Sequence, residues 1–339
     1  MAEPWLVRDF KMVSAELLVV LVNWRRPIDT IACLESLRCH AGNSVVAVCE
    51  NGSADDSAAR LLGYFDSRFG QGVRFSATSG CFVVYKDSNQ CECAVLYLSD
   101  RNTGFAAGNN LAFNSARLFF NSEYVWFLNN DTEITPSSVR LLLERMRGDS
   151  QIGICGSTIV YAHDKKTVQA LGGARYSPCT GMLSEIGQGS SLPVNVNEHE
   201  IESNLSYVSG ASMFVSNLFL EKVGLMCEDY FLYYEELDWS RRAVKAGFRL
   251  GYVKDSIVFH KEGASLGSGR SNRRSALSEF YGVRNRLRIT RRFFPIFLPV
   301  VYIFSWLQVV RRLLQGHISR ALMMARILLG VQRSYDQSG

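Results

Sequence analysis

Short apolar runs alternate with helical repeats along the first part of the chain. The runs Glu16–Asn23 and Ser44–Glu50 have the length and continuity of strands that are buried on both faces. After each run, apolar residues recur at helical spacing, in Pro27–Arg38 and in Asp55–Phe65. This alternation predicts parallel strands joined by right-handed crossovers. Because ligands of such sheets collect beyond the carboxyl ends of the strands, polar residues at those ends are the candidates for chemistry.

The alternation is interrupted once and then resumes. Residues 66–94 fit it poorly and predict an inserted hairpin around Phe75 and Phe82–Tyr85. Gly, Ser, Pro and Asn are frequent over residues 172–202, which predicts a long loop over the active face. The other expected elements are, in chain order, the strand Ala94–Leu98, the helix Gly108–Phe120, the strand Tyr124–Leu128, the helix Pro136–Met146, the strand Ile152–Tyr161, the ordered segments Tyr207–Val215 and Phe219–Val223, the helix Leu237–Ala246, and the strands Arg249–Tyr252 and Ser256–His260. The pattern predicts an α/β fold in which helices flank a mainly parallel sheet.

Charge is distributed unevenly along the 339 residues. The chain carries 37 Lys and Arg against 32 Asp and Glu, a formal net charge of +5. Residues 1–269 hold 24 of the basic groups and 30 acidic groups, a net charge of −6. Residues 270–339 hold 13 Arg and two acidic residues, a net charge of +11. We therefore divide the chain into an N-terminal extension (1–15), an α/β domain (16–269) and a basic helical region (270–339).

The basic region contains an uncharged apolar stretch, Phe293–Val310, between clusters of arginine. As a helix with a rise of about 1.5 Å per residue, its 18 residues extend about 27 Å, which is borderline for spanning a bilayer. Pro295 and Pro299 break its first third, so the sequence favours a re-entrant or interfacial helix pair, with His317–Gln332 as the second helix. The flanking arginines suit an anionic membrane surface better than nucleic acid. Packing of these helices in a homo-oligomer is the alternative.

Cysteine usage and the start of the chain bear on the cellular compartment. Nine cysteines occur without regular spacing, and Cys91 and Cys93, the only close pair, have no second pair to complete a zinc site. Charged residues interrupt the first 16 residues, so we expect no secretory signal there. Both observations favour free thiols in a reducing cytosol. Together with the basic region, they predict a cytoplasmic protein that is peripherally associated with the inner face of the plasma membrane.

Two polar clusters that follow predicted strands suit a nucleotide. In Glu50-Asn51-Gly52-Ser53, a carboxylate at a strand end can accept hydrogen bonds from a base or ribose; the alternative is an ordinary Asn-Gly turn. Residues 101–110 (RNTGFAAGNN) place two glycines and three amide side chains at the start of a helix. Backbone N–H groups at the positive end of a helix dipole suit a pyrophosphate. The alternative is a plain loop before a helix cap.

Two further clusters suit a metal ion and a general base. Asp131, in Asn129-Asn130-Asp131-Thr132, can hold Mg²⁺ or Mn²⁺ together with diphosphate oxygens; the alternative is an Asx-turn. Glu235, Glu236 and Asp238 lie within four residues among aromatics, where carboxylates are costly to bury without compensation. They suit deprotonation of a hydroxyl, and the alternative is an acidic helix start. His260 ends an apolar strand and can complete a metal shell.

Together, these motifs resemble the inverting family-2 glycosyltransferases of the GT-A fold, and most of all their bacterial rhamnosyltransferase-type members. The likeness covers roughly residues 16–265 and rests on five motifs in order: Asn23-Trp24, Glu50-Asn51-Gly52-Ser53, Asn102 to Asn109, Asn129-Asn130-Asp131, and Glu235-Glu236-x-Asp238-Trp239. The resemblance implies inverting transfer of a sugar from a nucleotide-diphosphate donor to an acceptor hydroxyl, with Mg²⁺ or Mn²⁺. The rhamnosyltransferase type implies L-rhamnose from dTDP-rhamnose and a lipid-linked saccharide acceptor in cell-envelope polysaccharide synthesis.

The resemblance also implies a role for each motif residue. Glu236 is the catalytic base with Glu235 beside it, Asp131 and His260 bind the metal, and Asp238 and Trp239 shape the acceptor site. The donor-binding residues are Asn23, Arg25, Glu50, Asn51, Arg101, Asn102, Gly104, Asn129 and Asn130.

The sequence departs from the family's usual pattern at three positions. Glu50 and Glu236 stand in place of Asp, and Asn129 removes one carboxylate from the metal motif. These departures motivate an alternative, a catalytically silent protein of this fold that binds nucleotide sugars or serves as a scaffold. A metal-dependent nucleotidyltransferase is disfavoured, because no basic triphosphate-clamping motif stands near the first strand.

Overall fold

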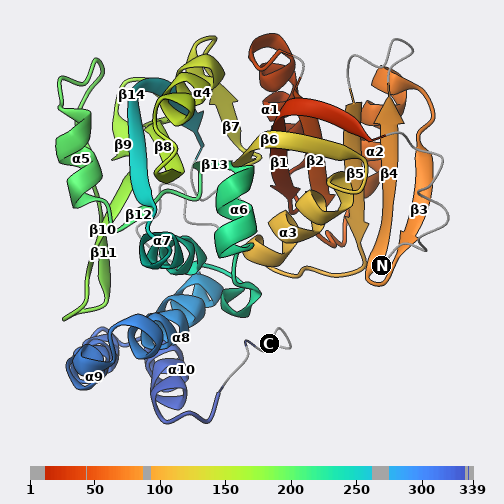
Figure 1. Cartoon of the computed structure of the whole chain (residues 1–339). Helices are drawn as coiled ribbons and strands as arrows, with labels where there is room; N and C mark the ends of the chain where they lie inside the picture. The colour runs from red at the N-terminus through yellow and green to blue at the C-terminus, as the bar shows by residue number, and fades with distance from the viewer. Residues whose placement is uncertain (1–11, 43, 87–92, 262–274, 333–334, 336–339) are drawn as a thin grey trace.

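One twisted, mixed sheet forms the centre of the protein (Figure 1). The structure, a computed structural model, describes residues 12–42, 44–86, 93–261, 275–332 and 335. Eleven strands of the described residues form the sheet, in the order β3-β4-β5-β2-β1-β6-β13-β8-β14-β7, with β9 paired to β8. Their bounds are β1 Val13–Asn23, β2 Val45–Glu50, β3 Val73–Ala77, β4 Gly80–Lys86, β5 Cys93–Ser99, β6 Phe120–Leu128, β7 Thr132–Ile134, β8 Ile152–Tyr161, β9 Val168–Leu171, β13 Ser212–Ser216 and β14 Arg249–His260.

The centre of the sheet is parallel, as the apolar runs predict. β5, β2, β1 and β6 lie side by side in parallel, and β8 pairs in parallel with β14. β13 runs antiparallel between β6 and β8 and joins the two parallel groups. The expected hairpin is β3–β4, and it extends the edge of the sheet through antiparallel pairing of β4 with β5. The predicted α/β class is therefore confirmed.

Helices cover both faces of the sheet, and each face has its own apolar core. On one face, α1, α2 and α4 bury side chains such as Phe65 and Leu142. On the other face, α3, α6 and α7 bury side chains such as Phe113 and Trp239. This double coverage explains why the central strands read as continuous apolar runs. The bounds are α1 Pro27–His40, α2 Ser57–Phe69, α3 Phe105–Ala116, α4 Ser138–Gly148, α6 Asn217–Val223 and α7 Glu235–Lys245.

The segment expected to be a long loop, residues 172–202, is instead largely ordered. It contains β10 (Gly173–Ser177) and β11 (Met182–Glu185), which form a three-stranded antiparallel sheet with β12 (Tyr207–Val208), and the start of α5 (Glu198–Asn204). The loop prediction was wrong, because strands of four or five residues among small polar residues give too weak an alternation to be recognised.

Three boundaries also differ from those expected. α3 begins at Phe105 rather than Gly108, and Phe120 belongs to β6. The last two predicted strands form one strand, β14, with a register shift between Val253 and Ile257.

The eight described cysteines are free thiols, and Cys91 lies outside the described residues.

The C-terminal helices form a compact group below the sheet (Figure 1). Ser275 caps the first of them by accepting a hydrogen bond from the backbone N–H of Ser278 at 3.1 Å. Phe280, Val301 and Met324 belong to the apolar core that the group encloses. The helices are α8 Ala276–Phe293, α9 Leu298–Leu314, preceded by the short 3₁₀ turn Pro295–Phe297, and α10 Ile318–Leu328.

Candidate active site

Asp131 and His260 meet where β7 pairs with β14. Thr132, the first residue of β7, is the register partner of His260 at the end of β14. The backbone N–H of Lys261 also donates to the carbonyl oxygen of Asp131 at 3.1 Å. As a result, Nε2 of His260 lies 3.1 Å from Oδ1 of Asp131, and both side chains are buried. The pairing of these strands thus joins the two predicted metal ligands from distant parts of the chain.

The surroundings of this pair suit a divalent cation. Gln169 Oε1 lies 2.8 Å from Nδ1 of His260 and orients the ring, while Asn129 Nδ2 lies 3.2 Å from Nε2. Burial alone would raise the pKa of Asp131, but the hydrogen bond and charge of His260 outweigh it and hold the pKa below its ordinary value. No third His, Cys, Asp or Glu joins the pair among the described residues. A carboxylate and an imidazole fit Mg²⁺ or Mn²⁺ when substrate oxygens complete the shell.

The ends of β1, β2 and β6 bring other predicted donor residues to the same edge of the sheet. Asn23 and Glu50 are register partners. Thr30 links two amides, because its hydroxyl donates to Asn23 Oδ1 at 2.7 Å and accepts from Asn130 Nδ2 at 2.8 Å. Glu50 accepts a hydrogen bond from the backbone N–H of Ser53 at 3.0 Å, and burial raises its pKa above the ordinary value.

Asn51 connects the end of β2 to the loop that precedes α3. Its Nδ2 donates to Asn102 Oδ1 at 3.1 Å and to the carbonyl oxygen of Gly104 at 3.0 Å. Its Oδ1 accepts from the backbone N–H of Thr103 at 3.0 Å. Asn51 and Asn102 thus hold this loop in shape, and the amide of Asn51 is already engaged by the protein itself.

Two glycines allow the backbone segments around this loop to approach closely. Gly52 has a φ of +64°, and a Cβ there would lie 2.2 Å from the carbonyl carbon of Arg101. Gly104 has a φ of +87°, and a Cβ there would lie 2.4 Å from the carbonyl oxygen of Phe231. That carbonyl accepts a hydrogen bond from the backbone N–H of Phe105 at 2.8 Å. The donor-side loop therefore rests directly on the segment that leads to Glu235 and Glu236.

The two remaining predicted donor residues lie at the surface of this edge. Arg25, with a φ of +58°, donates its backbone N–H to Ser53 Oγ at 2.8 Å, and its guanidinium lies over the Trp24 ring at 5.0 Å. The side chain of Arg101 is exposed. Both side chains carry positive charge beside the buried polar groups of the strand ends.

Glu235 and Glu236 begin α7 but face different surroundings. Glu235 is fully buried, its Oε2 makes no hydrogen bond, and burial followed by the charge of Glu236 raises its pKa well above the ordinary value. Glu236 is partly exposed, and burial together with the charge of Glu185 raises its pKa to about 7. Only Glu236 is therefore accessible to a substrate without rearrangement of the helix.

A short chain of contacts connects Glu236 to the sheet edge that holds Asp131 and His260. A Cβ at Gly210 would lie 2.4 Å from Oε1 of Glu236, so the carboxylate rests directly on this glycine. The next residue, Ala211, accepts a hydrogen bond at its carbonyl from the backbone N–H of Asn129 at 3.1 Å. Asn129 in turn lies beside His260.

Asp238 and Trp239, expected to shape an acceptor site, are fully buried. Asp238 pairs with Arg242 at 2.8 Å and with Arg292 at 2.6 Å, and it accepts a hydrogen bond from Tyr230 at 2.9 Å. The indole N–H of Trp239 donates to a backbone carbonyl, and its ring packs between Phe127 and Phe219. Both side chains thus have structural contacts, and direct contact with an acceptor would require them to be uncovered.

Asn285, on α8, is a residue that sequence reasoning missed. Its Nδ2 donates to the carbonyl oxygens of Tyr230 at 2.8 Å, Leu232 at 2.8 Å and Tyr233 at 3.1 Å. This segment is strained, because Phe231, Tyr233 and Tyr234 all have φ between 66° and 73°. The strained segment ends at Glu235, so the C-terminal helical group helps to position the carboxylates. A polar side chain on the apolar face of a basic helix was the only sequence signal.

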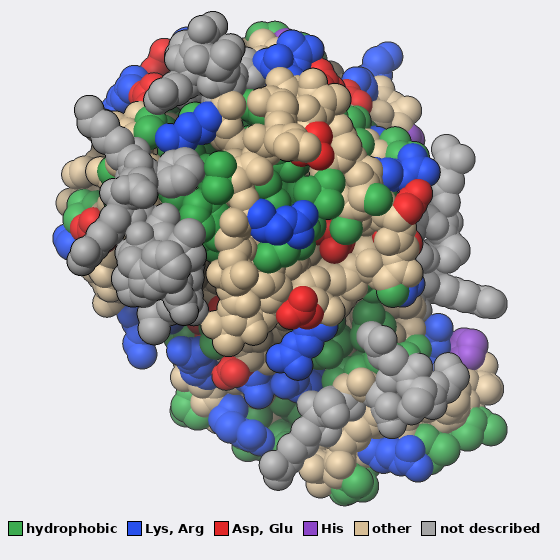
Figure 2. Space-filling model, turned by 90° about the vertical axis from the view of Figure 1, so that its right-hand side faces the viewer, with side chains coloured by type: hydrophobic (Ala, Val, Ile, Leu, Met, Phe, Trp, Pro, Cys, Tyr) green, Lys and Arg blue, Asp and Glu red, His purple; other side chains and the backbone are tan. Residues whose placement is uncertain are grey.

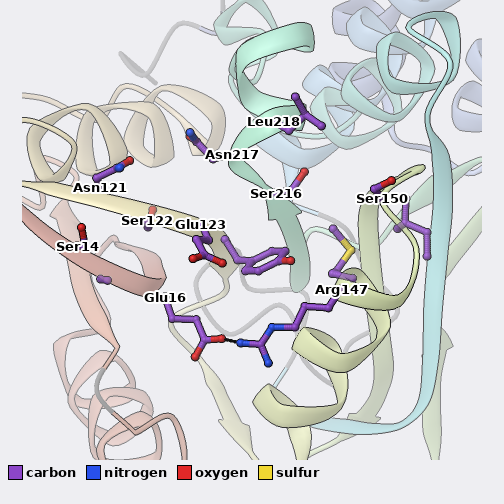
Figure 3. Close-up of a pocket in the computed structure, with 14 residues that line it drawn as sticks. Ser14, Glu16, Asn121, Ser122, Glu123, Arg147, Ser150, Ser216, Asn217 and Leu218 are labelled. Carbon is purple, nitrogen blue, oxygen red and sulfur yellow. Dashed lines mark ion pairs between the residues drawn. The ribbon is translucent and has the colours of Figure 1, made fainter.

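A cavity of about 680 Å³ lies elsewhere, at the amino-terminal ends of the central strands β1 and β6 (Figure 3). Ser14 and Glu16 of β1, Glu123 of β6 and Arg147 of α4 are among its lining residues, and Arg147 forms an ion pair with Glu16. None of the five motifs contributes to it. The arrangement of motif side chains, rather than cavity size, therefore marks the candidate active site.

Comparison with known proteins agrees with this geometry. Residues 83–185 match the sequence model described as "Glycosyl transferase family 2", a range that includes Asn102 and Asp131 but not Glu236 or His260. The chain is 25% identical over 198 residues to the low-salt glycan biosynthesis hexosyltransferase Agl10 of Haloferax volcanii. That alignment covers 56% of this chain and 62% of Agl10, so the chain spans less than two thirds of this relative.

Solved structures with low sequence identity share the fold. GalNAc-T7 with UDP, GalNAc and Mn²⁺ has a TM-score of 0.58 at 13% identity, over 87% of this chain and 50% of that one. The Pyrobaculum calidifontis mannosyltransferase PcManGT with GDP-Man and Mn²⁺ has a TM-score of 0.54 at 11% identity, over 98% and 94%. S. aureus TarS with UDP-GlcNAc has a TM-score of 0.50 at 12% identity, over 86% and 71%. Residues 83–185 thus match the glycosyl transferase family 2 model, and the chain shares the fold of GalNAc-T7 and PcManGT.

Proposed function

We propose that this protein transfers a sugar from a nucleotide-diphosphate donor to an acceptor hydroxyl, with inversion at the anomeric carbon. The observation that carries the proposal is the series of contacts that links Glu236, through Gly210 and Asn129, to the pair of Asp131 and His260. Glu236 takes the proton of the acceptor hydroxyl as that oxygen attacks the sugar from the side opposite the diphosphate. One base suffices for this single displacement, in contrast to the two carboxylates of glycosidases.

Asp131 and His260 are the residues that would hold a Mg²⁺ or Mn²⁺ ion. Such an ion neutralises the charge that develops on the leaving diphosphate. The Mn²⁺ in GalNAc-T7 and PcManGT, which share the fold, supports the same requirement here. Asn129, which replaces a carboxylate of the family motif, lies beside the imidazole and leaves two protein ligands for the ion.

The donor follows from resemblance rather than from a base-reading contact. UDP, GDP-Man and UDP-GlcNAc are the nucleotides and nucleotide sugars in the three similar structures, and the Haloferax relative is a hexosyltransferase. These support a nucleotide-activated hexose. Within that class we propose dTDP-rhamnose as donor and a lipid-linked saccharide of the cell envelope as acceptor, on the resemblance of the motifs to rhamnosyltransferases.

The C-terminal helices support a lipid-linked acceptor. One described segment, Pro295–Leu314, is long and apolar enough to cross a membrane by length and composition alone. Its buried face, with Val301, Ser305 and Val309, packs inside the helical group. The opposite face exposes a continuous apolar stripe at helical spacing, with 49% to 85% of each side chain accessible: Ile296, Val300, Ile303, Leu307, Val310 and Leu314.

This amphipathic arrangement favours a helix that lies in the membrane surface over one that spans it. Figure 2 shows Lys and Arg side chains gathered on the lower part of the face it presents, over the helical group. Arginines near an apolar stripe add attraction to anionic lipid, about 1 kcal/mol each. We therefore propose peripheral association with the inner face of the plasma membrane, and a homo-oligomer through the same stripe is the alternative.

A nucleotide-sugar panel tests the enzymatic proposal. Purified full chain is incubated with dTDP-rhamnose, UDP-, GDP- and dTDP-hexoses, with Mn²⁺, Mg²⁺ or chelator, and slow donor hydrolysis and thermal shift are recorded. We expect metal-dependent stabilisation and hydrolysis with one donor class. Stabilisation without turnover, even with added acceptors, would favour the silent nucleotide-sugar-binding alternative, and no response to any donor would refute the proposal.

Flotation with phosphatidylglycerol-containing vesicles tests the membrane proposal. The double variant Ile303→Glu, Leu307→Glu places two charges on the stripe, whereas Ile28→Glu places one on α1, where the native side chain is 69% exposed. We expect wild type and Ile28→Glu to float and the double variant to remain in the dense fraction. Flotation of the double variant equal to wild type would refute it. An oligomer in solution that the double variant dissociates would establish the alternative.

A further inference from the structure

Arg286, on α8, is a buried arginine with unmatched hydrogen-bond donors. Its side chain is only 6% exposed, and neither Nε nor Nη1 has a hydrogen-bond partner. A guanidinium carries five N–H donors and stays charged at any physiological pH. Burying such a charge without a counter-ion is costly, because the charge loses its hydration. A paired carboxylate normally compensates this desolvation energy. An unmatched arginine inside a folded protein therefore points to a ligand.

Neighbouring arginines of the helical group are paired with acidic side chains. Arg292 pairs with Asp238 at 2.6 Å. Arg312 and Arg320 both pair with Glu279, at 2.7 Å and 3.2 Å. Arg286 is more deeply buried than these three arginines, yet its Nε and Nη1 have no partner.

The stem of Arg286 lies against the turn between β10 and β11. A Cβ at Gly181, which has a φ of +68°, would lie 2.4 Å from Cγ of Arg286 and 3.5 Å from Cγ1 of Val301 on α9. The carbonyl of Gly181 accepts a hydrogen bond from Tyr234 at 2.9 Å. The glycine therefore lets the turn close over the stem of the arginine, with Val301 of α9 beside the same turn.

Arg286 lies between a polar region and an apolar surface, which is the arrangement that an amphiphilic ligand requires. Figure 1 shows the hairpin of β10 and β11 extending down toward α9, and Gln308 of α9 contacts Met182 at the start of β11. The other face of α9 carries the exposed apolar stripe. At the far end of β11, Glu185 is close enough to Glu236 to raise its pKa. With a rise of about 3.3 Å per residue, Met182 and Glu185 are about 10 Å apart.

We propose that Arg286 binds the phosphate or diphosphate of the acceptor, and this rests on the proposed transfer to a lipid-linked saccharide. The oxyanion accepts hydrogen bonds from the guanidinium between the hairpin and α9. The saccharide then extends about 10 Å along the hairpin to bring its hydroxyl to Glu236, and the lipid chain continues along the stripe of α9. Arg286 is thus a binding residue for the acceptor's anionic group, separate from the donor side of the sheet edge.

Binding of a prenyl diphosphate tests this inference without requiring turnover. Farnesyl diphosphate and farnesol are titrated into full-chain wild type, Arg286→Gln, Arg286→Lys and Arg291→Gln by calorimetry. Arg291 is exposed on the same helix, so its variant removes the same charge from the same region. We expect at least tenfold weaker binding of farnesyl diphosphate by Arg286→Gln, partial recovery in Arg286→Lys, near wild-type affinity in Arg291→Gln, and no effect on farnesol.

Three further probes separate the sources of an oxyanion. Pyrophosphate alone reports a free phosphate, UDP with Mn²⁺ reports the donor diphosphate, and phosphatidylglycerol vesicles report lipid headgroups. An affinity for UDP, or for vesicles, that falls in Arg286→Gln as much as that for farnesyl diphosphate would overturn the assignment to the acceptor. Equal binding of farnesyl diphosphate by wild type and Arg286→Gln would overturn the site altogether.

Stability provides an independent readout of the same inference. Because the charge is unmatched, Arg286→Met should leave the melting temperature unchanged or raise it. A drop of several degrees would assign the arginine to the fold instead. If farnesyl diphosphate binds at Arg286 while the nucleotide-sugar panel gives no response, the anion site stands and the transfer proposal fails.

Discussion

Asn285→Ala tests the coupling between the C-terminal helices and the carboxylates of α7. The native amide donates two N–H hydrogens to three backbone carbonyls of the segment 230–233. Each lost hydrogen bond costs about 1 kcal/mol, and the carbonyls left unsatisfied in a buried site cost about 1–3 kcal/mol more. Relaxation of three strained residues, at about 1–2 kcal/mol each, returns part of that sum. We expect a loss of about 2–4 kcal/mol in the free energy of unfolding.

The same substitution should lower catalytic turnover while the protein is still folded. The strained segment runs directly into Glu235 and Glu236, so its relaxation shifts both carboxylates. A misplacement of about 1 Å can cost about a hundredfold in rate. We therefore expect kcat to fall by about a hundredfold, with the metal-dependent part of donor binding retained. Among the described residues, Asp131 and His260 contact each other, Asn129 and Gln169, which lie outside the strained segment.

Urea denaturation and steady-state transfer kinetics, both at a temperature well below the melting transition, measure these effects. Arg291→Ala, an exposed change on the same helix, is the control and should change neither quantity. Surface substitutions usually change the free energy of unfolding by no more than about 0.5 kcal/mol. A change for Asn285→Ala within that range, together with unchanged kcat, would refute the coupling.

Three other predictions concern the site itself. Asp131→Ala should abolish the Mn²⁺-dependent part of donor binding in calorimetry, and an unchanged affinity would count against the metal assignment. Burial and the charge of Glu185 raise the pKa of Glu236 to about 7. Because the base must be deprotonated, kcat/KM should rise as pH increases through about 7. Glu235 and Tyr207 are the other titratable groups in this environment. Because the raised carboxyl pKa favours the protonated folded state, stability should fall as pH rises from about 4.5 to about 7 and then level off. A flat profile of both quantities would contradict the assignment. Gly210→Ala should destabilise by about 1–3 kcal/mol and displace Glu236, whereas Gly63→Ala in α2, with open space around it, should be neutral or stabilising.

The order of strands and helices in the α/β region was predictable because strands that are buried on both faces consist of nearly continuous apolar residues. Runs such as Glu16–Asn23 and Tyr124–Leu128 correspond to β1 and β6, whose central residues are inaccessible to solvent. The hairpin of β10 and β11 gave no comparable signal. Short strands in Gly- and Ser-rich sequence depend on their partners, and pairing is a property of the folded chain.

The motifs around Glu50 and Asp131 stood out because each follows the end of a strand, but the contacts of their side chains were not predictable. Asp131 and His260 meet through the pairing of β7 with β14, which spans a long interval of sequence. Asp238 looked like an active-site carboxylate, yet it forms a buried ion pair with Arg292 of α8. The composition of the basic region suggested a separate tail, whereas Arg292 and Asn285 pack into the structure that positions Glu236.

The central claim is that one accessible carboxylate, Glu236, activates the acceptor. Comparing the Glu236→Gln and Glu235→Gln variants tests this claim most directly. Transfer by Glu236→Gln and Glu235→Gln is measured with the donor identified by the panel, alongside donor affinity by calorimetry. We predict that Glu236→Gln abolishes turnover while donor affinity stays within about twofold of wild type, and that Glu235→Gln retains measurable turnover. Near wild-type turnover by Glu236→Gln would contradict the account.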